Sequence, residues 1–161
     1  MRIGVVSDTH NNLPNVRKIV ALFNAADVDR VVHTGDITEP KVLHEFGQLN
    51  APMVGVFGNN DHDPDELASI ASSLGMEFSH APLFLDWHQR RILVVHDPRE
   101  LDDHLDASVH LALHGHTHLH NHYESDQGIV FNPGECAGLM EGFNTVGIVD
   151  LITLETELLN F

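Results

Sequence analysis

Histidine, carboxylate and amide side chains recur along this chain in short clusters, each directly after an apolar run. The clusters are Asp8-Thr9-His10, His33-Thr34-Gly35-Asp36, Gly58-Asn59-Asn60-Asp61, His96 and His114-Gly115-His116-Thr117-His118. Imidazole nitrogen and carboxylate or amide oxygen suit divalent transition metals, and no thiolate is required. The candidate ligands are Asp8, His10, Asp36, Asn59, His96, His116 and His118. Their joint occurrence in this order predicts a metal centre.

The size of this ligand set predicts two metal ions, because seven ligands are too many for one typical transition-metal site. A carboxylate can bridge two ions through its two oxygens, and Asp36, at the central strand end, is the natural bridge. The donors suit Mn²⁺, Ni²⁺, Fe, Zn²⁺ or Co²⁺ better than Ca²⁺ and do not choose among them. Two ions about 3.5–4 Å apart can clamp a phosphoryl group.

Regular elements must bring these clusters together, because they are far apart in the chain. Apolar runs predict strands at 3–7, 30–33, 53–57, 91–95 and 109–113, and helical spacing predicts helices at 12–25, 40–49 and 64–74. Each polar cluster then follows the carboxyl end of a strand. In α/β sheets that edge is where ligands bind, so we expect the clusters to converge on one crevice.

The second half of the chain is richer in expected strands. They cover 77–79, 83–87, 120–125, 129–132, 145–150 and 153–159, with a turn and a short helix over 97–105. Ser125-Asp126-Gln127-Gly128 predicts a hairpin turn. Alternating strands and helices followed by a run of strands predict a layered α/β fold. No linker or internal repeat divides the chain, so we expect a single domain over residues 1–161.

Composition excludes several classes of protein. The formal net charge is -16, which argues against long nucleic acid as a partner. This acidity suits either a high-salt cytoplasm or a merely acidic protein. No apolar run approaches the roughly 18 residues of a membrane span, and the N-terminus lacks a signal-peptide pattern, so we expect a cytoplasmic protein with no membrane partner. The single Cys136 excludes an internal disulfide and a multi-cysteine zinc site.

As an ordered set, the clusters resemble the calcineurin-like metallophosphoesterase superfamily. The short chain and the segment Asn132-Pro133-Gly134-Glu135-Cys136 are similar to its small single-domain phosphodiesterase branch. The resemblance implies an α/β fold in the form of a four-layer α/β/β/α sandwich, with two mostly mixed β-sheets flanked by helices. It also implies two ligand sets that share Asp36: Asp8, His10, Asp36 and His118 for one ion, and Asp36, Asn59, His96 and His116 for the other.

The activity implied by the resemblance is metal-dependent hydrolysis of small phosphodiesters. A hydroxide that bridges the two divalent ions would be the nucleophile. A phosphomonoesterase on a small phosphate ester is the alternative within enzymes, and a noncatalytic metal-binding interaction module of the same fold is the alternative outside them. All seven ligand positions are filled, which favours a working site. Small relatives tend to self-associate, so a homo-oligomer stays an open alternative.

Two positions depart from the pattern of the superfamily. Larger members carry a histidine that assists catalysis where this chain has Asn60. His62 is a candidate substitute, and a surface-loop histidine is its alternative interpretation. Asp97 follows His96 where family members usually have glycine, and this carboxylate either orients a ligand histidine or begins a turn. General acid catalysis is typically worth about 10²–10⁴-fold, so substrates with good leaving groups should react best.

Overall fold

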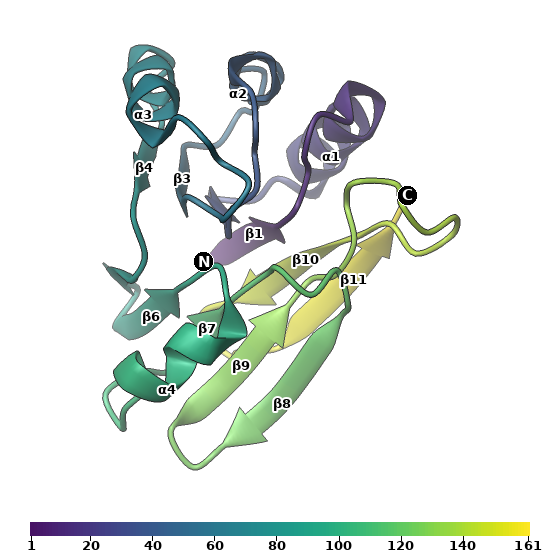
Figure 1. Ribbon diagram of the computed structural model, residues 1–161. Coiled ribbons are helices and arrows are strands. Elements are labelled where there is room, and N and C mark those ends of the chain that lie inside the picture. Colours follow the sequence, from purple (N-terminus) through teal and green to yellow (C-terminus); the bar gives the residue numbers. More distant parts are fainter.

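The apolar strands of the chain's two ends build one six-stranded sheet in the computed structural model, which describes all residues 1–161 (Figure 1). Its strand order is β11-β10-β1-β2-β3-β4. The strands are β1 (Arg2–Val6), β2 (Arg30–His33), β3 (Met53–Val56), β4 (Glu77–Ser79), β10 (Thr145–Asp150) and β11 (Thr156–Asn160). The neighbours from β1 to β4 are parallel, whereas β10 is antiparallel to β1 and β11. The carboxyl ends of β1 to β4 therefore lie at one edge.

A second sheet of five strands packs against the first, in the order β5-β6-β7-β9-β8. The strands are β5 (Leu83–Trp87), β6 (Arg90–Val94), β7 (Leu111–Leu113), β8 (Asn121–Ser125) and β9 (Gly128–Asn132). The middle strands β6, β7 and β9 are parallel, and the two outer strands are antiparallel to their neighbours. Ser125 pairs with Gly128, so the expected hairpin turn joins β8 to β9. Both sheets are mixed.

Helices cover the outer face of each sheet. The helices α1 (Leu13–Ala26), α2 (Pro40–Phe46) and α3 (Pro64–Ser73) lie on the six-stranded sheet, and α4 (Leu101–His104) lies on the five-stranded sheet (Figure 1). A proline in the first turn suits each of the three longer helices, because proline has no N–H to leave unpaired there. None of the helices combines the length and apolarity needed to cross a membrane.

Three apolar layers hold these four structural layers together. Val16, Ile19 and Phe23 of α1 belong to the cluster between the helices and the first sheet. The cluster between the sheets contains Ile3 and Val5 together with side chains of β6, β7 and β9. A smaller cluster joins the second sheet to Leu101 of α4 and its surroundings. The expected four-layer α/β/β/α sandwich is thus confirmed.

Some expected boundaries were too long. The second helix ends at Phe46 and is followed by Gly47, whose poor helix propensity stops it short of residue 49. The last strand begins at Thr156 and not at 153, because the Asp150 carboxylate accepts the Ile152 N–H and turns the chain there. The strand expected at 109–113 begins only at Leu111.

Candidate metal centre

The candidate ligands lie in the loops that follow the carboxyl ends of five strands. They come after β1 (Asp8, His10), β2 (Asp36), β3 (Asn59), β6 (His96) and β7 (His116, His118). Backbone hydrogen bonds join the first two loops. The Asp8 N–H donates to the Gly35 carbonyl at 3.0 Å, and the His10 N–H donates to the Asp36 carbonyl at 2.9 Å. The His116 N–H donates to Asp8 Oδ2 at 2.9 Å and joins a loop of the second sheet to this pair, so the loops form a connected rim across the edges of both sheets.

Left-handed backbone is concentrated in this rim. The candidate ligands with positive φ are Asp8 (51°), His10 (43°), Asp36 (61°), His116 (68°) and His118 (55°). Aspartate and histidine enter this region more readily than most side chains, but it still costs them energy. Such conformations persist only where the surrounding structure fixes them, and they cluster at functional sites.

Glycines let the ligand loops approach one another closely. A Cβ added at Gly115 would lie 1.8 Å from Ser7 Oγ and 2.7 Å from Asp8 Oδ2. A Cβ at Gly35 would lie 2.5 Å from His96 Nδ1. All three distances are shorter than real contacts of a Cβ atom, so these two positions require glycine for the site to close.

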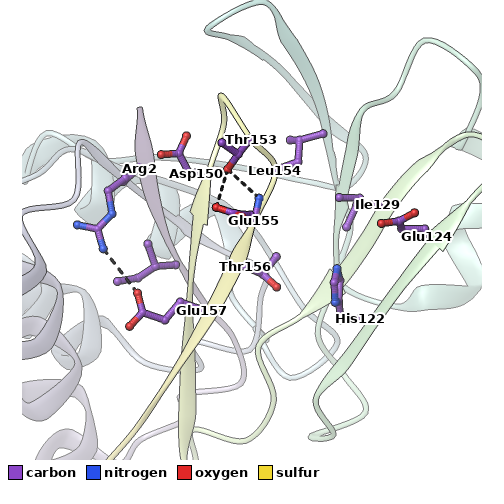
Figure 2. Close-up of a pocket in the computed structure, with 11 residues that line it drawn as sticks. Arg2, His122, Glu124, Ile129, Asp150, Thr153, Leu154, Glu155, Thr156 and Glu157 are labelled. Atoms are coloured by element: carbon purple, nitrogen blue, oxygen red, sulfur yellow. Dashed lines mark hydrogen bonds and ion pairs between the residues drawn. The ribbon is translucent and has the colours of Figure 1, made fainter.

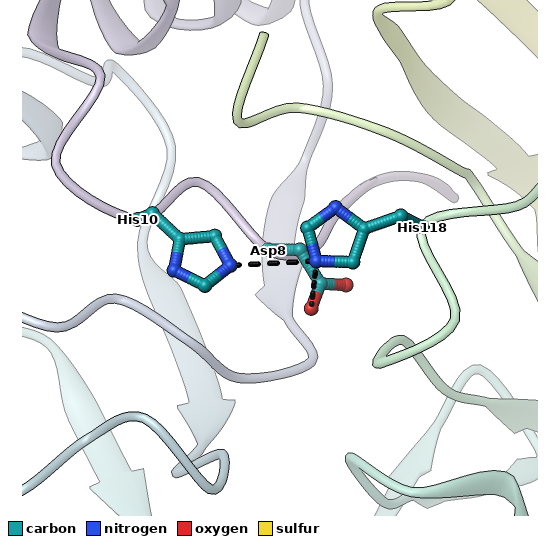
Figure 3. Close-up of side chains that lie close together, drawn as sticks. All are labelled: Asp8, His10 and His118. Carbon is teal, nitrogen blue, oxygen red and sulfur yellow. Dashed lines mark hydrogen bonds and ion pairs between the residues drawn. The ribbon is translucent and has the colours of Figure 1, made fainter. Parts of the chain in front are cut away.

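Asp8, His10 and His118 form the first group of converging donor atoms (Figure 3). The His118 Nε2 lies 3.5 Å from Asp8 Oδ1 and 3.4 Å from His10 Nε2. Asp8 is fully buried, and its Oδ1 has no hydrogen-bond partner in the protein. A buried carboxylate oxygen without a partner is costly, and a cation beside it removes that cost. The donors present at this position therefore fit a metal ion.

Asp36, Asn59, His96 and His116 form a second, adjoining group. The Asn59 Oδ1 lies 3.0 Å from His96 Nε2 and 2.9 Å from His116 Nδ1. Asp36 lies between the groups, with Oδ1 3.5 Å from His96 Nε2 and Oδ2 3.7 Å from His10 Nε2. Asp8 also converges with donors of both groups, although the sequence singled out Asp36 alone as the shared carboxylate.

Hydrogen bonds behind the histidines fix which ring nitrogen faces the centre. The His96 Nδ1–H donates to the Thr34 carbonyl at 2.8 Å, and the His118 Nδ1–H donates to the carboxylate of Glu135. In a neutral ring Nε2 then carries a lone pair. That of His96 faces the acceptor Asn59 Oδ1, and that of His118 faces the acceptor Asp8 Oδ1. A metal ion satisfies such facing lone pairs, and outer hydrogen bonds of this kind are usual for metal-bound histidines.

The ionisation of Asp36 and His96 is coupled. Burial favours the neutral carboxyl, but hydrogen bonds from His96 and Asn60 outweigh it and hold the pKa of Asp36 well below its ordinary value. Burial likewise disfavours a charged His96 ring, yet Asp36 raises the pKa of His96. Without a metal ion these shifts favour an ionised Asp36 beside a protonated His96, and a bound ion would take the place of the proton on His96 Nε2.

Two buried polar residues support the rim without facing the centre. His33 accepts the Gly35 N–H on Nδ1 at 3.1 Å and bonds to Thr9 Oγ1 through Nε2 at 3.0 Å, and burial lowers the pKa of His33 to about 3. Asp61 accepts the backbone N–H groups of Gly58, Asp36 and Thr38, and burial raises its pKa. No sequence pattern distinguishes Asp61 from an ordinary loop aspartate.

The residues that depart from the superfamily pattern take three different positions. The Asn60 side-chain amide donates to Asp36 Oδ2 at 2.7 Å, and its backbone N–H donates to Asp36 Oδ1 at 2.8 Å. His62 is exposed and makes no hydrogen bond or ion pair with the cluster. Asp97 begins the turn before α4, and its Oδ2 lies 3.8 Å from His116 Nε2. The partner that orients His96 is therefore the Thr34 carbonyl.

One cleft of about 280 Å³ adjoins this centre. It is lined by Phe57, Gly58, Asn59, His80, Ala81, His96, Asp97 and Glu100. His80 belongs to none of the ligand clusters that the sequence pattern predicts. Its position directly after the expected strand at 77–79, like that of the other clusters after their strands, could have indicated it.

The largest cavity, of about 730 Å³, lies elsewhere, beside the amino end of β1 (Figure 2). Its polar lining includes Arg2, Glu124, Asp150 and Glu157, and Arg2 pairs with Glu157 at 3.7 Å. Neither group of converging metal-ligand side chains in the molecule contains a residue of this cavity. Cavity size and metal-binding chemistry are therefore separated in this fold.

Comparisons with known proteins agree with this geometry. The family model described as the calcineurin-like phosphoesterase superfamily domain matches residues 1–153. A phosphodiesterase of Methanocaldococcus jannaschii is 35% identical over 161 residues, which cover 93% of each chain. A solved structure described as a novel archaeal phosphodiesterase has a TM-score of 0.92 at 31% identity, and the match covers 100% of both chains.

More distant structures share the fold. A phosphoesterase of E. coli has a TM-score of 0.76 at 18% identity, with 99% of this chain and 98% of that chain covered. Vps29 of Entamoeba histolytica, solved in complex with zinc, has a TM-score of 0.70 at 16% identity, with 100% and 98% covered.

Proposed function

Since the chain belongs to the calcineurin-like phosphoesterase superfamily, we propose that it is a metal-dependent phosphodiesterase acting on small phosphodiesters. The observation that carries this proposal is buried Asp8, whose Oδ1 has no partner within the protein. It converges with His10 and His118 on one side and with Asp36 and His96 on the other. The name of the Methanocaldococcus relative supports the choice of phosphodiester substrates.

Two divalent ions are the cofactors in this proposal. Asp8, His10, Asp36 and His118 would hold one ion, and Asp36, Asn59, His96 and His116 would hold the other. Such a pair would supply a hydroxide nucleophile near neutral pH and would neutralise charge that develops on the phosphoryl oxygens. The ligand set accepts Mn²⁺, Ni²⁺, Fe, Zn²⁺ or Co²⁺, so the native ion depends on availability.

Hydrogen bonds within the protein orient the ligand side chains of this site. The Thr34 carbonyl and the Glu135 carboxylate hold His96 and His118 with Nε2 facing inward. Asn60 holds both oxygens of Asp36. Cys136 is fully buried, and burial raises the pKa of its thiol, so it is not a nucleophile. In the proposed reaction the attacking oxygen comes from water.

The size and charge around the site favour a small substrate. The adjoining cleft holds about 280 Å³, at the lower end of ordinary ligand pockets, and the chain carries a net charge of -16. A long polyanion would be repelled by this charge, whereas a small phosphodiester would meet the metal ions locally.

A metal-reconstitution screen tests the proposal. The chelator-treated protein is loaded separately with each of the five metals and assayed on bis(4-nitrophenyl) phosphate and on 4-nitrophenyl phosphate. We expect two ions per chain and faster hydrolysis of the diester. A monoester rate far above the diester rate would establish the phosphomonoesterase instead. Hydrolysis of neither ester with any metal, together with partner binding that survives Asp36→Asn, would establish the noncatalytic module.

A further inference from the structure

Phosphodiester hydrolysis at this centre leaves one chemical need unmet. When the P–O bond breaks, the electron pair stays on the leaving oxygen, and an alkoxide needs a proton at that moment. The Asn60 amide has no titrating proton, and it is engaged with Asp36 at 2.7 Å. This inference rests on the proposed function, and it concerns where that proton comes from.

The carboxyl end of β4 brings a histidine to the same edge as the ligand loops. β4 is the parallel neighbour of β3, with Val56 opposite Ser79, and the Phe57 N–H donates to the Ser79 carbonyl at 3.0 Å. His80 follows directly after β4, so it lies beside the loop that carries Asn59. His80 and the candidate ligands Asn59 and His96 line one cleft.

The His80 ring packs against an aromatic neighbour, while its two nitrogens have no hydrogen-bond partner in the protein. It packs edge-on against the Phe57 ring, with centroids 5.5 Å apart and planes at 64°. Neither ring nitrogen hydrogen bonds to another group of the protein, and the residue is exposed. Both nitrogens are thus available to a ligand in the cleft.

The other titratable side chains of the cleft are unsuited to donate a proton. Both carboxylate oxygens of Asp97 accept hydrogen bonds from the Arg99 guanidinium, so Asp97 is held as an acceptor beside a permanent cation. The Glu100 Oε1 accepts the Asp97 N–H at 3.3 Å, which engages it in capping the turn. His96 has Nδ1 on the Thr34 carbonyl and Nε2 toward the metal centre. Histidine is the side-chain type that exchanges a proton most readily near neutrality, which leaves His80.

We propose that this cleft receives the leaving alcohol of the diester and that His80 is the catalytic residue that protonates it. The proton on a ring nitrogen moves to the leaving oxygen as the P–O bond breaks, and the neutral imidazole then takes a proton from water. Asp97 and Glu100 place carboxylates on the cleft wall, so the leaving group is a small alcohol without negative charge of its own.

The leaving group is the experimental variable that tests this role. His80→Gln is compared with the unchanged protein on methyl 4-nitrophenyl phosphate and on methyl phenyl phosphate, both metal-loaded. The nitrophenolate departs readily without a proton, so its release should change little. Phenol is a poorer leaving group, and its release should slow by about 10²-fold or more, within the range of general acid catalysis. The fall in the phenyl-ester rate at alkaline pH, where a general acid has lost its proton, should also disappear in His80→Gln. Asp97, Glu100 and His96 are the other titratable groups that line this cleft.

Two further readouts separate this role from a structural one. His80→Gln should bind the same number of metal ions as the unchanged protein. In the zinc-loaded protein the His80 ring resonances should shift when a non-hydrolysable methylphosphonate diester is added. His44→Gln, an exposed histidine on the outer side of α2, is the matched control and should behave as the unchanged protein.

Several results would overturn the inference. Equal loss on both esters would assign His80 a structural role, and no loss on either would assign it none. A selective loss in His62→Gln in place of His80→Gln would move the proton donor to that residue. An unchanged protein that hydrolyses no ester would remove the proposed function, whereas unshifted His80 resonances in an active protein would remove only the role of His80.

Discussion

The two groups of histidines in the candidate metal centre are supported in different ways. On the first side His118 donates to the carboxylate of Glu135, which is 1% exposed, and Asp8 is completely buried. On the second side His96 donates to a backbone carbonyl, and Asn59 is exposed. The side chain of His116 is 37% exposed, compared with 20% for His118.

One side of the centre is rigidly supported and the other is accessible to solvent. The first side is braced by a buried charge, which is an arrangement that raises the basicity of a ligand histidine. The second side borders the cleft and is open to solvent. We therefore expect the first ion to be bound more tightly and the substrate to arrive from the second side.

Removal of the Asp36 carboxylate, which lies between the two sides, should weaken both ions and so remove the expected difference in their affinity. Asp36 lies 3.7 Å from His10 and 3.5 Å from His96. Asp36→Asn should therefore weaken the binding of both ions and lower activity by more than about 100-fold, which exceeds the usual effect of removing a group behind a ligand. Metal content and diester hydrolysis measure this. Asp126→Asn, in the exposed β8–β9 turn, is the control. Full retention of both ions would contradict the shared role.

Loss of the buried brace should affect the first side alone. Glu135→Gln removes the charge behind His118 and should weaken one ion by about 10–100-fold while the other binds normally. Calorimetric titration of the metal-free protein resolves the two affinities. Glu124→Gln, on the wall of the distant cavity, is the matched control. Equal weakening of both ions would show that the two sides are not independently supported.

Loss of the Asn60 amide should have a smaller effect, because the backbone N–H of the same residue still donates to Asp36 at 2.8 Å. Asn60→Ala should cost about 1 kcal/mol, or roughly fivefold in metal affinity. The same titration measures it, with Asn121→Ala, an exposed residue of β8, as the control. A loss as large as that of Asp36→Asn would mean that the side-chain bond alone positions the carboxylate.

His33 lies beneath both sides, and its effect should appear only in acid. Its pKa is lowered to about 3 by burial, so the unfolded chain binds a proton below pH 6.5 that the folded chain refuses. The free energy of unfolding should therefore fall as pH falls below 6.5, by about 1.4 kcal/mol per pH unit from this residue. His33→Gln should flatten that slope in denaturant titrations between pH 6.5 and 5. Unchanged slopes would show that His33 is protonated in the folded protein.

The sequence predicted the fold well because its signals were local. Each apolar run next to a polar cluster marked a strand end, and parallel pairing of β1, β2 and β3 then places those ends together. The single-domain organisation stays a prediction that no observation here tests.

The supporting residues were less predictable, for a physical reason. Glu135 lies 17 residues from His118 and the Thr34 carbonyl lies 62 residues from His96, and their bonds depend on how two sheets pack. A backbone carbonyl has no sequence signature, and a lone acid before Cys136 resembles any loop glutamate. His80 was equally hard to predict, because it comes close to the metal centre only through the pairing of β4 with β3.

The left-handed backbone at five of the candidate ligands sets a limit on how far this protein can be stabilised. Each such residue costs roughly 1–2 kcal/mol, which glycine would not incur. Selection for heat resistance alone would therefore favour glycine at positions such as His10 and His118, and the most robust descendants would be the ones that no longer bind metal. Thermostable variants should accordingly be sought in the layers beneath the rim, where durability and activity do not compete.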